Sequence, residues 1–69
     1  MNANEKTKMK TLLGYLVEHN REHSQEVKDW AGKAADMGEA CLADGMMQAA
    51  RTMDDASSLL EKALRKLEA

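Results

Sequence analysis

The sequence lacks proline and phenylalanine, and Tyr15 and Trp30 are its only aromatic residues. Without proline, nothing in the composition interrupts a helix strongly, and the abundance of Ala, Leu, Met, Glu and Lys favours helix throughout. The sequence therefore predicts an all-α protein. Its 69 residues are too few for more than one domain, so we expect a single helical domain over residues 1–69.

Disulfides and membrane spans are also missing. Cys41 is the only cysteine, which excludes an intramolecular disulfide, and we expect it to be a buried small residue near a turn. No stretch approaches the roughly 18 consecutive apolar residues of a membrane span, and no apolar run follows the first lysines. We therefore expect a cytoplasmic protein with no membrane partner.

Neither charge sign dominates the chain. Ten basic and twelve acidic residues give a formal net charge of −2, and neither sign forms a long block. With so little aromatic surface for stacking on bases, this balance argues against a nucleic-acid partner. The chain also has no glycine-rich phosphate loop and no HExxH pattern, so we do not expect an enzyme.

Apolar and small residues recur at helical spacing in both halves of the chain. The first set lies within roughly 120° of arc on a helix from about residue 5 to 37, and comprises Met9, Leu12, Leu13, Leu16, Val27, Trp30, Ala31, Ala34 and Met37. The second set lies on a helix that starts between residues 39 and 45 and ends near 67, and comprises Met46, Ala49, Ala50, Met53, Ala56, Leu60, Leu64 and Leu67. Gly38 suits the left-handed residue that ends the first helix.

Two arms of similar length predict a long antiparallel helical hairpin. Because a lone hairpin covers only one side of each apolar stripe, we expect two copies to dimerise into a four-helix bundle. The expected interface residues are Trp30 as the anchor, with Met9, Leu16, Met53 and Leu60. Asn20 leaves an alternative open, since asparagine is a good helix N-cap and a break there would give a three-helix bundle.

Both histidines lie in the segment EHNREH, near the middle of the first predicted helix. His19 and His23 are four residues apart, so on a helix both imidazoles can reach one metal ion. Neutral imidazole suits Zn, Ni or Co, and Glu22 or Glu26 could add an oxygen ligand or orient a ring. A two-fold axis near this pair would place four imidazoles around one ion. In the alternative, the rings bond to Glu26 or Ser24 and bind no metal.

The stretch LLGYLVEHNREHSQEVKDWAGKAADMG, residues 12–38, resembles a group of small uncharacterised bacterial and archaeal helical proteins. In that group an EHN-x-EH segment precedes a Trp-Ala helix and a glycine turn. The matching residues are Glu18, His19, Asn20, Glu22, His23, Trp30 and Ala31. The resemblance implies a small helical module in a metal-handling setting, with no established activity. Two functions stay open: metal binding through the histidine pair, and a metal-free homo-oligomeric interaction module.

Overall fold

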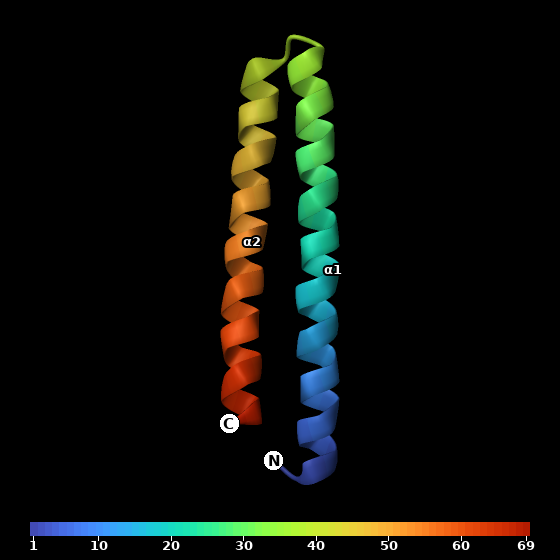
Figure 1. Ribbon diagram of the computed structural model, residues 1–69, viewed down its shortest axis with the longest axis vertical. Helices are drawn as coiled ribbons and strands as arrows, with labels where there is room; N and C mark the ends of the chain where they lie inside the picture. Colours follow the sequence, from blue (N-terminus) through green and yellow to red (C-terminus); the bar gives the residue numbers. More distant parts are fainter.

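The computed structural model describes residues 1–69 and consists of two antiparallel α-helices joined by a tight turn (Figure 1). α1 spans Ala3–Asp36 and α2 spans Ala40–Glu68. The Cα positions extend 53 Å along the hairpin and 14 by 12 Å across it. The predicted all-α hairpin is confirmed. Neither helix has an apolar stretch long enough to cross a membrane.

The ends of α1 follow from local chemistry. Asn2 caps its start, because its side chain accepts a hydrogen bond from the Glu5 backbone N–H at 2.8 Å and the Glu5 carboxylate accepts one from the Asn2 N–H at 3.3 Å. At the other end Gly38 adopts a φ of 82°, as the sequence predicts for a residue that stops a helix. The chain then reverses and α2 begins.

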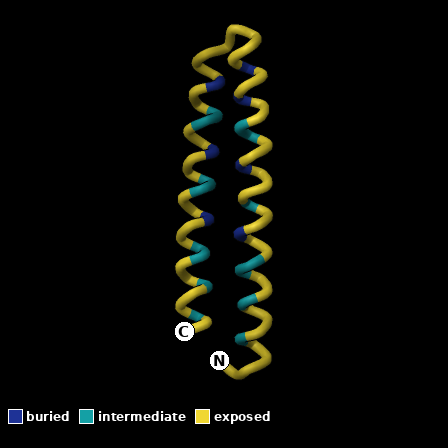
Figure 2. The backbone as a smooth tube through the Cα atoms, viewed as in Figure 1, coloured by how far each residue is buried: buried dark blue, intermediate teal, exposed yellow.

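The two helices meet along a line of small side chains, which we call the small-residue seam. Its members recur every seven residues and are Val17, Ser24 and Ala31 on α1 with Ala43, Ala50 and Ser57 on α2. Figure 2 shows the buried positions of the two helices facing one another. A repeat of seven keeps the same face of each helix turned toward its neighbour, and small side chains let the two backbones approach closely.

The three-helix alternative is wrong, because α1 runs through Asn20 without a break. The Asn20 amide donates hydrogen bonds across the hairpin, to the Met53 carbonyl at 2.8 Å and to the Ser57 hydroxyl at 2.9 Å. Ser24 likewise donates to the Ala50 carbonyl at 3.2 Å. These side chains bond to α2 instead of capping a new helix, and a polar group placed in such a seam fixes its register.

One further expectation from the sequence is wrong, namely that Cys41 is buried. The first apolar set divides between two faces of α1, because five of its nine members are exposed: Met9, Leu12, Leu16, Trp30 and Met37. Cys41 is also exposed, since it lies two residues before the buried Ala43 and so points about 200° away from it around α2. The interior of the hairpin is built instead from smaller residues, including two serines.

Candidate functional site

Exposed apolar residues of α1 and its C-cap lie beside the seam, before and after the histidine pair, and we call them the apolar flank. Its members are Met9, Leu12, Leu16, Trp30 and Met37. Leu16, His23 and Trp30 each come one residue before a seam residue, so they share one side of the buried line. The flank residues occupy positions of an alternating three- and four-residue spacing, which they share with His19 and His23 at the centre and with the charged residues Glu26 and Lys33.

His19 and His23 point their Nε2 atoms at each other, 3.0 Å apart, with ring centroids 4.4 Å apart and ring planes at 89°. One Nε2 carries a hydrogen and donates to the other. Tyr15 stacks on the His19 ring with centroids 5.1 Å apart. The Nδ1 atom of His23 lies 3.8 Å from the Glu26 carboxylate. Both rings are therefore held by a neighbour on the same helix.

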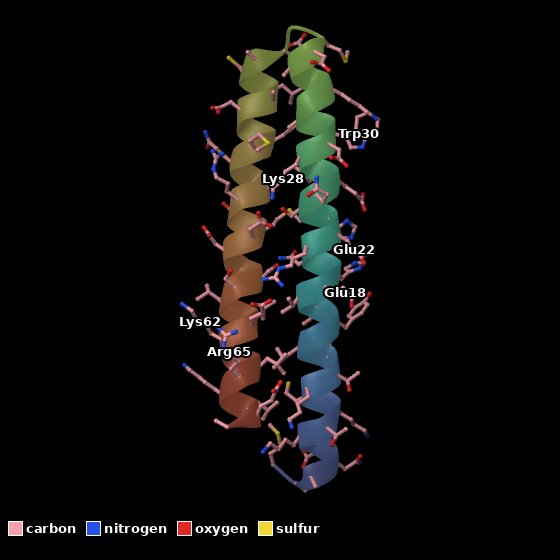
Figure 3. The ribbon with its side chains drawn as sticks, in the orientation of Figure 1. Glu18, Glu22, Lys28, Trp30, Lys62 and Arg65 are labelled. Atoms are coloured by element: carbon pink, nitrogen blue, oxygen red, sulfur yellow. The ribbon has the colours of Figure 1, made fainter.

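The two acidic residues expected to join the histidines lie in different places. Glu22 lines a shallow hollow of about 220 Å³ together with Tyr15, Glu18 and His19. Figure 3 shows Glu18 and Glu22 pointing away from α2. Glu26 is near Nδ1 of His23 and not near the converging Nε2 atoms. No group of three or more His, Cys, Asp or Glu side chains within one chain could hold a metal ion.

The predicted interface residues divide between two surfaces. Met9, Leu16 and Trp30 are exposed on the apolar flank, and Figure 3 shows Trp30 directed away from α2. Met53 and Leu60 are half-buried in α2, three residues after the seam residues Ala50 and Ser57, so they pack in the contact between the two helices of one chain.

Near the turn, the apolar flank borders a hollow of about 240 Å³ that both helices line. Its apolar walls are Trp30, Ala34 and Met37 from α1 with Leu42 and Met46 from α2. Trp30 is 59% exposed and carries the Lys33 ammonium 4.1 Å above its ring. The ring of Trp30, the largest side chain of the protein, therefore presents an exposed apolar surface next to an apolar hollow.

The opposite side of the seam is ionic. Lys28 bonds to Asp54 at 2.8 Å and Arg21 pairs with Glu61, and both pairs join α1 to α2. The hydrogen bond from Lys28 lowers the pKa of Asp54, and the hydrogen bond from Arg21 lowers the pKa of Glu61. The sequence alone does not predict these pairs, because the antiparallel register decides which charged residues of α1 and α2 face each other.

A family model described as a domain of unknown function, DUF8180, matches residues 9–67. The chain belongs to this family. No curated protein and no solved structure matches it. The matched region includes the whole apolar flank, the histidine pair and the seam, so the family domain and the hairpin largely coincide.

Proposed function

We propose that this DUF8180 protein is a non-catalytic self-association module, in which two hairpins pack through their apolar flanks into an antiparallel four-helix bundle. The observation that carries the proposal is the exposed apolar flank of α1, with Met9, Leu12, Leu16, Trp30 and Met37 at coiled-coil spacing. A line of large apolar side chains at this spacing is a helix-packing surface, and the hairpin leaves it uncovered.

The size of the exposed surface supports a missing partner. The chain exposes 5045 Å², whereas a compact monomer of its mass exposes about 4,300 Å². The excess of roughly 700 Å² is close to the area that one partner buries in a standard interface. The radius of gyration, 15.9 Å, likewise exceeds the roughly 11 Å of a compact domain of this length. Side-by-side pairing of two hairpins would bury most of the excess exposed area.

The composition of the interior supports the same proposal. The buried apolar residues are one valine and four alanines, and no leucine, methionine or aromatic side chain is fully buried. Each fully buried large apolar side chain stabilises a fold by about 1.5–3 kcal/mol, whereas alanine contributes much less. A second layer that covers Leu12, Leu16 and Trp30 supplies the large buried side chains that a single hairpin lacks.

A second copy is the partner that the flank fits best. Apolar residues lie on both sides of the central histidine pair, with Leu12 and Leu16 before it and Trp30 and Met37 after it. A two-fold axis at the level of the pair sets Leu12 of one chain near Trp30 of the other, because both lie nine residues from the midpoint of the pair, and it sets Leu16 near Glu26. The apolar contact between Leu12 and Trp30 then occurs twice, as in the isologous interface of a symmetric dimer.

The test is sedimentation equilibrium of the full chain over a wide range of concentration, on the parent and on two variants. Leu16→Glu places a charge in the flank and is expected to weaken association about 30-fold or more, because about 2 kcal/mol of apolar burial is lost. Leu59→Glu is the matched control: Leu59 is 64% exposed, and it lies two residues past the buried Ser57 on the outer face of α2.

The expected result is a dimeric parent, a dimeric Leu59→Glu variant and a monomeric Leu16→Glu variant. Circular dichroism should show that all three keep their helices. A parent that stays monomeric at every concentration would contradict the proposal. Equal loss of association in both variants would contradict the assignment of the interface to the flank of α1.

A further inference from the structure

We infer that His19 and His23 form half of a late-transition-metal site, which a second copy of the chain completes at the two-fold axis. The ion class is a divalent Zn, Ni or Co ion, which neutral imidazole binds well. This inference rests on the proposed dimer, because the site is shared between copies. A metal ion bound there would hold the two copies together in addition to their apolar contact.

The distance between the two Nε2 atoms suits chelation of a single ion. They are 3.0 Å apart, and imidazole nitrogen lies about 2.0–2.1 Å from zinc, so one ion placed between them meets both at an angle of about 90–95°. Widening the angle to the tetrahedral value separates the atoms to about 3.3 Å, a small rotation of either ring. The two Nε2 atoms therefore already lie at nearly the separation that one ion needs, and binding displaces the hydrogen that they share.

The neighbours of the rings favour the orientation that coordination needs. Glu26 lies 3.8 Å from Nδ1 of His23, on the side away from the Nε2 atoms. A carboxylate there accepts the Nδ1 hydrogen after a small shift, which leaves the Nε2 lone pair free for a metal. Tyr15 stacks on His19 and limits its rotation. Glu26 and Tyr15 are thus positioning residues, and the two histidines are the ligands.

One chain supplies too few ligands to close the site. No third His, Cys, Asp or Glu joins the pair within the chain, whereas a structural zinc site has four ligands. His19 and His23 lie at the centre of the apolar flank, where the axis of the proposed dimer passes. The axis brings a second pair of imidazoles to the same place, and four nitrogens then surround one ion. Metal binding and dimerisation become linked.

The experiment compares the parent with a His19→Ala, His23→Ala double variant, using Zn and Co(II) salts as probes. Both histidines are exposed and alanine favours helix, so the variant is expected to fold. Calorimetric titration of the parent should give one zinc ion per two chains. The double variant should bind zinc at least 100-fold more weakly, and only the parent should give the visible spectrum of four-coordinate Co(II).

The Leu16→Glu variant separates this inference from the proposed dimer. If the parent is a dimer and the double variant binds zinc as well as the parent does, the metal site is refuted and the dimer stands. If the parent binds one ion per chain, or if Leu16→Glu binds as tightly as the parent, the shared site is refuted. A parent that is monomeric both with zinc and with chelator refutes the dimer, and the shared site with it.

Discussion

The two sides of the seam offer a direct comparison within one hairpin. On one side, Arg21 and Lys28 follow seam residues by four positions and pair with Glu61 and Asp54 of α2. On the other side, Leu16 and Trp30 precede seam residues by one position and are exposed. The charged residues on the ionic side find their partners within one chain, whereas the apolar residues on the other side are exposed.

This difference shows how two sides of one helix can differ in chemistry, with one side used within the hairpin and the other exposed. The small-residue seam joins α1 to α2 and the ion pairs confirm that register, so the large apolar side chains are not needed for the hairpin itself. They are free for the second contact that we propose on an adjacent face. The histidine pair belongs to that second face, since His23 precedes the seam residue Ser24 as Leu16 precedes Val17.

The largest expected effect comes from enlarging the seam. Ser57 is fully buried and accepts a hydrogen bond from Asn20, and leucine there would push the helices apart and leave the Asn20 amide without that acceptor. Overpacking costs about 1–3 kcal/mol and the lost hydrogen bond about 1 kcal/mol more. We expect Ser57→Leu to remove most of the folded population, measured by urea unfolding followed by circular dichroism.

Ser58 provides the control for this change, because it is the next residue and is exposed. Ser58→Leu should alter the unfolding free energy by less than about 0.5 kcal/mol, as surface substitutions usually do. Similar losses in the two variants would mean that the helices do not meet at Ser57, and the division of α1 into a seam and a flank would then fail.

Part of this arrangement was predictable from the sequence and part was not. Helical spacing predicted both helices and Gly38 predicted the turn, because these signals depend on residues close together in the sequence. The small-residue seam was not predicted, because its fully buried members include Ser24 and Ser57 and serine does not count in a pattern of apolar residues. The spacing of His19 and His23 predicted that the rings meet. Their Nε2 contact and their supports, Tyr15 and Glu26, depend on side-chain rotamers that no spacing specifies.

A smaller effect is expected from the glycine on the ionic side. Gly14 lies in α1 and borders a hollow that Arg21 and Glu61 also line, and a Cβ added there would meet no atom within 4 Å. Gly14→Ala should therefore stabilise the hairpin by about 0.5–1 kcal/mol, because alanine has less backbone freedom to lose in a helix.

Gly38→Ala is the opposite case. The φ of 82° at Gly38 is strained for any residue with a Cβ, so this change should destabilise by about 1 kcal/mol although the space around it is open. Thermal unfolding should show a higher midpoint for Gly14→Ala and a lower midpoint for Gly38→Ala than for the parent. A stabilising Gly38→Ala would show that the turn does not hold the conformation described here.

The smallest effect concerns the ion pairs and pH. The pKa values of Asp54 and Glu61 are lowered by their cationic partners in the folded chain, so the carboxylates favour folding above their unfolded pKa of about 4. This contribution disappears as the pH falls through the lowered pKa values of the folded state, and protonation leaves Lys28 and Arg21 unpaired.

Asp54→Asn should flatten the acid side of the stability profile, measured as the midpoint of urea unfolding from neutral pH downward. Asp55→Asn is the control, because Asp55 has no ion pair, and it should leave the profile of the parent unchanged. If both variants follow the parent, the ionic side contributes nothing to closing the hairpin, and the small-residue seam alone sets the antiparallel register.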